Sequence, residues 1–169
     1  MIRIAETKDS SDIAALSIQI WLDTYAKRGV RKSISQYVLS EFTEQNIEIK
    51  LSSENEVYFI AIEDDHLVGY LSLNVSARCP VTGSKKPELD RLYIQESFTG
   101  KGLGSKLLQE ALTFCSSAGL EQLWLTVFHE NTRALKFYEK HGFKEIGLTY
   151  FELENEKHKN YVLSTSIAV

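Results

Sequence analysis

The chain has 169 residues, of which 43% are hydrophobic and 25% charged, a balance typical of one soluble globular domain. It carries 19 Lys and Arg residues against 23 Asp and Glu, and the resulting net charge of −4 argues against a surface built to neutralise nucleic-acid phosphates. The longest apolar runs, "YFIAI" and "LWLTVF", are far shorter than the roughly 20 residues of a membrane-spanning helix.

The first half of the chain changes from a helical to a strand-like hydrophobic period. A short strand at "IRIAE" is followed by "DSSDIAALSIQIWLDTYA", which has apolar residues at helical spacing behind a polar start. The segment from "SISQYVLSEF" to "EIKLSS" predicts one or two further helices. The runs "EVYFIAIE" and "HLVGYLSLNV" are rich in β-forming residues and are joined through two aspartates, which predicts an antiparallel hairpin.

The second half alternates strands and helices. "ELDRLYIQ" predicts a strand, a glycine-rich turn and a helix follow, and "EQLWLTVF" predicts the next strand, so the order is that of a βαβ unit. A helix at "NTRALKFYEKH" is expected to stop at Gly142, and "KEIGLTYFEL" and "NYVLSTSI" are expected to be the last two strands. We therefore expect an α/β fold: a single domain over residues 1–169 with a mixed, mostly antiparallel central sheet and helices on both faces.

The cysteines and histidines give no sign of a structural cross-link or a metal. Cys79 and Cys115 are too few for a disulfide framework and are expected to be reduced. The four histidines lack the paired spacing of zinc ligands, so we expect no metal. The first residues do not read as a secretory signal, which predicts a cytoplasmic protein.

The stretch "FTGKGLGSKLLQEAL", residues 98–112, places glycines at 100, 102 and 104 between a strand and a helix. Such a turn lets backbone N–H groups converge beside the positive end of a helix, which makes a phosphate site. It does not fit a Rossmann fingerprint, because residue 105 is Ser, and it lacks the order of a P-loop. From this stretch alone, a tight turn that binds nothing is an equal alternative.

A second motif, "NTRALKFYEKHGF" at residues 131–143, resolves this ambiguity. Together with "ELDRLYI" and the glycine turn it resembles the GCN5-related N-acetyltransferase (GNAT) superfamily, whose pattern is a strand, [QR]xxGxG[GA] opening a helix, a strand, and N…A…FYxKxGF. The resemblance covers residues 88–147 closely, and the whole chain looks most similar to bacterial PaiA-type spermine/spermidine acetyltransferases. The chain departs from the pattern at the head of the glycine motif, where the family's Arg or Gln falls on Thr99.

The resemblance implies acetyl-CoA as acetyl donor, with its pyrophosphate on the amides of residues 99–105 and its pantetheine arm paired like an extra strand with residues 92–94. The cofactor-binding residues that it implies are Leu92, Tyr93, Ile94, Thr99, Gly100, Lys101, Gly102, Leu103, Gly104, Ser105 and Asn131. Asn131 is also a good helix N-cap, a structural role that it can fill in either case.

Amine attack on a thioester expels a thiolate, so a proton donor beside the sulfur helps it leave. Tyr138 matches the family's tyrosine in that role. The amine must also lose a proton, since its pKa in water is about 10.4. Asp90 lies where polyamine acetyltransferases of this superfamily place a Glu, and Glu88 shares its face of the strand. Each carboxylate can equally be an exposed charge at a strand end.

The PaiA-like sequence predicts a small-molecule amine acceptor, namely a polyamine such as spermidine or spermine. Trp21, Asp23 and Tyr25 are the first choices for lining its groove, although helix-surface and core roles suit them as well. Two other classes stay open: a peptide or protein acetyltransferase acting on N-terminal or lysine amines, and a non-catalytic acetyl-CoA-binding module. We expect neither nucleic acid nor membrane as a partner, and a homodimer is left open.

Overall fold

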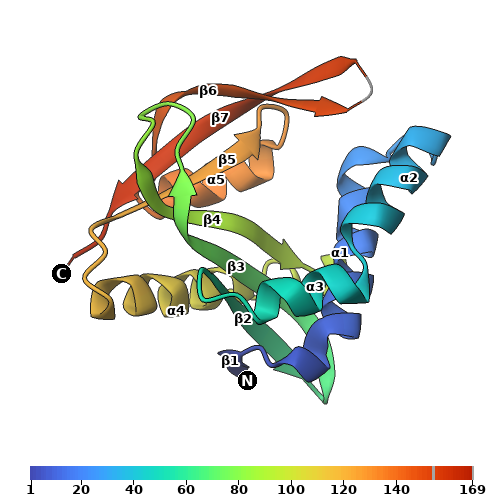
Figure 1. Cartoon of the computed structure of the whole chain (residues 1–169), viewed down its shortest axis with the longest axis horizontal. Coiled ribbons are helices and arrows are strands. Elements are labelled where there is room, and N and C mark those ends of the chain that lie inside the picture. Colours follow the sequence, from blue (N-terminus) through green and yellow to red (C-terminus); the bar gives the residue numbers. More distant parts are fainter. Residues whose placement is uncertain (154, 169) are drawn as a thin grey trace. The chain divides into compact units, whose positions relative to one another are not determined.

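The computed structural model describes residues 1–153 and 155–168, and its elements can be followed by colour in Figure 1. In chain order they are β1 (Ile2–Ile4), the 3-10 helix η1 (Thr7–Asp9), α1 (Ser10–Tyr25), α2 (Lys32–Glu41), α3 (Glu44–Leu51), β2 (Glu56–Glu63), β3 (His66–Arg78), β4 (Lys85–Ile94), the 3-10 helix η2 (Glu96–Phe98), α4 (Leu103–Ser117), β5 (Gln122–Phe128), α5 (Thr132–Lys140), β6 (Lys144–Leu153) and β7 (Glu156–Ser166).

The strands form one sheet of seven in the order β1-β2-β3-β4-β5-β7-β6. The pair β4 and β5 is parallel, whereas β1 with β2, β5 with β7 and β6 with β7 are antiparallel. The predicted class, α/β with a mixed and mostly antiparallel sheet, is confirmed. The parallel pair also confirms the predicted βαβ unit, because α4 connects its two strands.

Residue contacts divide the chain into two compact units. The first comprises Met1–Leu73 and Arg91–Ala111, and the second comprises Asn74–Asp90 and Leu112–Val169. That residues 1–169 act as one domain stays a prediction.

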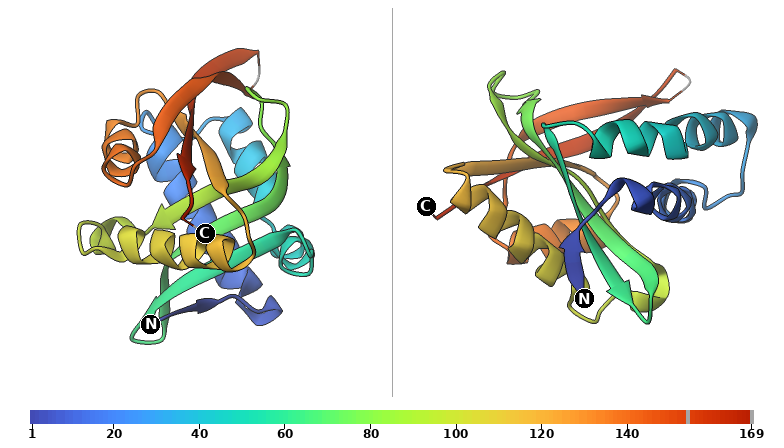
Figure 2. Two further views of the ribbon diagram at one scale, coloured as in Figure 1. Left: turned by 90° about the vertical axis from the view of Figure 1, so that its left-hand side faces the viewer. Right: turned by 60° about the horizontal axis from the view of Figure 1, so that its bottom comes forward.

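The first unit buries apolar residues on both faces of its strands. On one face, Tyr58, Ile60 and Tyr70 form a core cluster with α1 and α3, to which Ile13 and Ile47 contribute. Because side chains alternate along a strand, neighbours such as Phe59 and Leu71 face the other way, toward α4. The views of Figure 2 show α1 and α3 on one side of β2 and β3 and the start of α4 on the other.

The connection between β2 and β3 is set by two residues with left-handed backbone. Asp64 has φ 47° and Asp65 has φ 61°, the conformation that a two-residue type I′ hairpin turn requires at both central positions. Aspartate tolerates this conformation better than most side chains do. The predicted hairpin through two aspartates is therefore confirmed.

In the second unit, β7 lies between β5 and β6, with Trp124 opposite Ser164 in the β5 and β7 pair. The order of strands was not predicted, because local patterns do not determine which strands pair. The α5 helix ends just before Gly142, whose φ of 85° is the left-handed conformation expected there. The expected reduced state of the cysteines is matched: Cys79 and Cys115 are free thiols, and both are buried.

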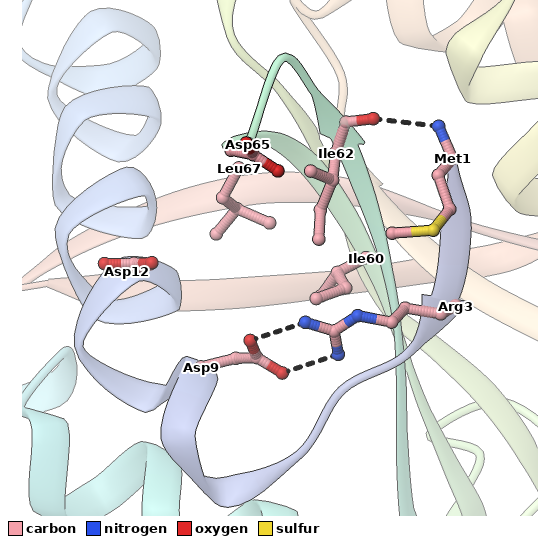
Figure 3. A pocket seen from close by; sticks show the side chains of 8 residues that line it. All are labelled: Met1, Arg3, Asp9, Asp12, Ile60, Ile62, Asp65 and Leu67. Atoms are coloured by element: carbon pink, nitrogen blue, oxygen red, sulfur yellow. Dashed lines mark hydrogen bonds and ion pairs between the residues drawn. The ribbon is translucent and has the colours of Figure 1, made fainter.

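An ion pair joins β1 to the beginning of α1. The Asp9 carboxylate accepts two hydrogen bonds of 2.8 Å from the Arg3 guanidinium and one of 2.7 Å from the Glu6 N–H. The pair lines the pocket drawn in Figure 3, and only 12% of the Asp9 side chain is exposed. The hydrogen bonds from Arg3 lower the pKa of Asp9, against the opposing effect of burial.

We predict that Asp9→Asn lowers the free energy of unfolding at neutral pH by about 1.5–3 kcal/mol, the range for hydrogen bonds to a charged group. Since the pKa of Asp9 is lower in the folded state than in the unfolded chain, its contribution is complete above the unfolded value of about 3.9 and is lost as pH falls through the folded value. Urea unfolding at pH values from about 7 to about 3 measures the difference between wild type and variant, which should shrink at the acid end.

Asp12→Asn is the matched control, because Asp12 lines the same pocket but is exposed in the first turn of α1. Its loss should cost less than about 1 kcal/mol. If the free energy of unfolding of wild type exceeds that of Asp9→Asn by the same amount at every pH, the carboxylate charge is not the source of the difference.

Candidate functional site

The turn between β4 and α4 needs glycine at two of its three glycine positions. Gly100 has φ 75° and Gly102 has φ 79°, and no atom lies within 4 Å of where a Cβ would stand on either. Glycine is therefore required by the backbone conformation at these two positions and not by crowding. The space beside both residues is open. Gly104 differs, because it is the second residue of α4.

The amides that follow this turn point out of the helix start. The Lys106 N–H donates to the Gly102 carbonyl at 3.1 Å, so the N–H groups of residues 103–105 precede the first hydrogen-bonded turn of α4. They also lie at the positive end of the helix dipole. The Thr99 N–H, in contrast, donates to the Glu96 carbonyl at 3.2 Å, and its hydroxyl donates to the same oxygen at 2.7 Å.

Thr99, where the family pattern has Arg or Gln, therefore closes the 3-10 turn η2, and the set of outward amides begins after it. Lys101 adds a full positive charge to this set. Its ammonium lies 4.9 Å from the centroid of the Phe98 ring, a cation–π contact that holds the side chain over the turn. Backbone N–H groups, a helix N-terminus and one ammonium together fit a pyrophosphate.

The last residues of β4 are held along one edge by β3. The Gln95 N–H donates to the Val68 carbonyl at 2.9 Å, and a Cβ on Gly69 would come within 2.8 Å of the Tyr93 carbonyl oxygen. Gly69 thus allows a close approach of the two backbones that a larger residue would prevent. Leu92, Tyr93 and Ile94 are half-buried at this end of the strand.

A cluster of aromatic rings around one arginine lies beside the same strand end. We define the α1–α2 cluster as Trp21, Tyr25, Tyr37, Phe42 and Arg91. Ring centroids are 4.6 Å apart for Trp21 and Tyr25 and 4.8 Å apart for Trp21 and Tyr37, and the Arg91 guanidinium lies 5.1 Å from the Phe42 ring centroid.

The structure brings together two of the three residues expected to line the acceptor groove. Trp21 and Tyr25 are one helical turn apart and in ring contact, with Trp21 buried and Tyr25 37% exposed. Asp23 is exposed, and at about 100° per residue it lies roughly 200° around α1 from Trp21. Asp23 is therefore directed away from the cluster.

Sequence reasoning missed Tyr37, Phe42 and Arg91. Two signals were available, since Arg91 and Tyr93 share a face of β4 by alternation, and Tyr37 and Glu41 are four residues apart on α2. Arg91 lies close to phenols: burial raises the pKa of Tyr93 and of Tyr25, and the charge of Arg91 opposes both shifts. Both rings are thus neutral hydrogen-bonding groups at physiological pH.

The remaining candidate residues belong to the second unit. Glu88 and Asp90 are half-buried two residues apart on β4, and Glu88 is opposite Trp124 in the parallel pair. The Asn131 side chain accepts a hydrogen bond of 3.2 Å from the Ala134 N–H, which confirms its role as the N-cap of α5. Tyr138 is 7% exposed, and its ring contacts Phe137 and Phe143 at centroid distances of 5.3 and 5.4 Å.

In residues 1–153 and 155–168, no three His, Cys, Asp or Glu side chains come together as a group that could hold a metal ion. Of the helices in the described part of the chain, none is both long and apolar enough to cross a membrane.

Comparison with known proteins gives a family match and several full-length relatives. The model of the Acetyltransferase (GNAT) family matches residues 19–143. An uncharacterized N-acetyltransferase of Lactobacillus delbrueckii subsp. lactis is 23% identical over 99% of this chain and 96% of its own length. The spermidine N(1)-acetyltransferase of Thermoplasma acidophilum is 29% identical, over 85% of this chain and 87% of that protein.

Among solved structures, the PaiA N-acetyltransferase of Thermoplasma acidophilum in complex with coenzyme A superposes with a TM-score of 0.78. The superposition covers 98% of this chain and 99% of that one, at 22% identity. At this identity the likeness establishes the fold.

We predict that Gly102→Val abolishes binding of coenzyme A, because a β-branched side chain would disfavour the left-handed backbone and fill the open space beside the amides. Calorimetric titration with coenzyme A measures this. Gly119→Val is the matched control: Gly119 has φ 70°, is equally open, and lies in the turn after α4. Both variants should lose similar stability, and only Gly102→Val should lose the ligand; equal affinity in the two would place the phosphate site elsewhere.

Proposed function

The chain belongs to the acetyltransferase (GNAT) family, and we propose that it acetylates a primary amine of a polyamine such as spermidine by direct attack on acetyl-CoA. Membership makes it an acyltransferase that uses acetyl-CoA to acetylate amines. The observation that carries the proposal is the turn at residues 99–105, where two left-handed glycines leave open space beside outward amides. The acceptor and the roles of individual residues are the proposed part.

The proposed donor site runs along the end of β4 into the turn. The pyrophosphate is received by the amides of Gly100 to Ser105 and by the Lys101 ammonium, and the pantetheine amides pair with the backbone of Leu92 to Ile94. Asn131, whose side chain caps α5, is proposed to contact the cofactor as well. The bound coenzyme A of the Thermoplasma PaiA structure supports a site of this kind.

The proposed reaction breaks the C–S bond of the thioester and forms a C–N bond. A neutral amine nitrogen attacks the carbonyl carbon of the thioester, the C–S bond breaks, and the sulfur leaves as a thiolate that takes a proton from the Tyr138 hydroxyl. The proton lost by the amine goes to Asp90 or Glu88, directly or through a water molecule. The tyrosine is then reprotonated from solvent, so the net products are an N-acetyl amine and free coenzyme A.

Direct attack is supported by the state of the thiols. Burial raises the pKa of the Cys115 thiol to about 11, and Cys79 is 2% exposed. A thiolate, not a thiol, is the effective nucleophile. Neither cysteine is therefore suited to carry the acetyl group as a covalent intermediate, and a ternary complex of enzyme, acetyl-CoA and amine accounts for transfer.

The choice of a polyamine rests on two observations. The Thermoplasma relative at 29% identity is a spermidine N(1)-acetyltransferase, and the net charge of −4 favours attraction of a polycation. A peptide or protein acetyltransferase would share the donor site and differ in the acceptor, and a non-catalytic module would bind acetyl-CoA without turnover.

The test of the acceptor is release of coenzyme A across spermidine, spermine, amino acids and short peptides. We expect spermidine and spermine to give the highest kcat/KM, with a value that falls as salt is raised because exposed charges are screened over about 8 Å at physiological ionic strength. If peptides turn over and polyamines release no more coenzyme A than buffer does, the polyamine assignment is wrong. Binding of acetyl-CoA without turnover of any amine would support the non-catalytic module.

We further predict that Tyr138→Phe lowers kcat by about 10²–10⁴ with little change in affinity for acetyl-CoA, because the lost hydrogen bond acts mainly as the thiolate forms. Tyr150→Phe, at an exposed position of β6, is the control and should keep wild-type kcat. Single-turnover rates separate chemistry from product release. A Tyr138→Phe enzyme with a nearly unchanged chemical rate would remove this residue from the role of acid.

A further inference from the structure

An ion pair between Arg91 of the α1–α2 cluster and Glu41, the last residue of α2, presents its carboxylate outward. Nη2 of Arg91 lies 3.3 Å from Oε1 of Glu41, and 14% of the Arg91 side chain is exposed against 37% of the Glu41 side chain. The cation is thus the inner partner and the anion the outer one. A molecule that approaches from solvent meets the negative member first.

Hydrogen bonds hold both the backbone and the side chain of Glu41 in place. The side-chain amide of Asn46 donates to the Glu41 carbonyl at 3.1 Å and to the Ser40 carbonyl at 2.8 Å, which fixes the end of α2. Arg91 in turn holds the Glu41 carboxylate while its guanidinium packs against Phe42. A carboxylate has about four acceptor positions, so the hydrogen bond from Arg91 does not exhaust it.

The position of Glu41 within its helix is electrostatically unfavourable. It is the last residue of α2, where the helix dipole places its negative end. A carboxylate there adds to negative potential that the helix already creates. The helix end thus adds to the negative potential at Glu41, while the charge of Arg91 opposes it.

The cluster lies beside the residues that we propose hold the donor. Arg91 and Tyr93 flank Leu92, the first residue proposed to pair with the pantetheine arm. Tyr37 contacts both Trp21 and Phe42, so aromatic rings continue from Glu41 toward α1. Aromatic faces receive alkylammonium groups and the methylenes between them.

We propose that Glu41 determines acceptor specificity by receiving the second, non-reacting ammonium of a diamine or polyamine, with the half-buried ring of Tyr37 along its methylene chain. Arg91 is a positioning residue that orients this carboxylate. The inference rests on the proposed acetyl transfer to amines and adds to it the residue that distinguishes a polyamine from a monoamine.

The charge of Arg91 determines what the loss of the Glu41 carboxylate should do to amine binding. The pair is neutral overall, and its outer member is negative. Glu41→Gln removes that charge and leaves the positive charge of Arg91 in place beside an uncharged amide. A second ammonium should then be repelled where it was attracted, whereas an amine with a single charge at the reacting end should be affected little.

The experiment compares butane-1,4-diamine with butylamine, which differ in the second ammonium. Wild type should prefer the diamine by roughly tenfold in kcat/KM, as expected for one ion pair assisted by aromatic contact. Glu41→Gln should lose this preference through a higher KM for the diamine, with kcat and the constants for butylamine nearly unchanged. Glu41→Asp, which keeps the charge, should recover part of the preference.

Two controls remove other carboxylates of the first unit. Asp23→Asn tests the exposed aspartate of α1, and Glu48→Gln tests an exposed glutamate of α3, and both should keep the preference for the diamine. Thermal unfolding and coenzyme A affinity identify a Glu41 variant that is misfolded. Should Glu41→Gln not fold, the comparison of Glu41→Asp with Asp23→Asn decides, since only the former should reduce the preference.

The outcomes separate the two proposals. Equal turnover of both amines by wild type, equal loss on both amines in Glu41→Gln, or loss of the preference in Asp23→Asn would each overturn the assignment of Glu41 while acetyl transfer to amines stands. No release of coenzyme A from wild type with either amine would overturn the proposed function itself.

Discussion

The left-handed backbone at Gly100 and Gly102 is the constraint on which the donor site depends. It lets the chain leave the 3-10 turn η2 and enter α4 with the first amides of the helix directed outward. The helix cannot turn to hide them, because Leu107, Leu108 and Ala111 are fully buried on its inner face. The proposed anion binding therefore follows from backbone geometry, and that geometry is present with Thr99 where the family pattern has Arg or Gln.

The recognition of the acceptor that we propose depends on side chains instead, and on contacts between distant parts of the sequence. Glu41 and Arg91 are separated by 50 residues, yet their pairing fixes where the negative charge beside the α1–α2 cluster is presented. A positive site made by the backbone suits the anionic coenzyme. A negative site made by a side chain suits the cationic amine.

The sequence predicted those parts of the fold that local chemistry determines. The two aspartates between β2 and β3 favour a left-handed turn, and Gly142 ends α5 for the same reason. Two helices rather than one follow α1, because the Thr43 hydroxyl accepts a hydrogen bond of 3.0 Å from the Asn46 N–H and starts α3. The position of β7 between β5 and β6 could not be predicted, since hydrophobic period says nothing of strand order. The charge of Asp23 favours a place in the groove, whereas helical periodicity places it on a different side of α1 from Trp21 and Tyr25.

The central claim is that the amides after Thr99 receive the pyrophosphate of coenzyme A while the end of β4 receives its pantetheine arm. Backbone amide NMR tests it most directly, in separate titrations with coenzyme A and with inorganic pyrophosphate. Coenzyme A should shift the amide signals of residues 100–105 and of residues 92–94, and pyrophosphate should shift the first group alone. Signals of residues 100–105 that stay unchanged at saturating coenzyme A would contradict the account.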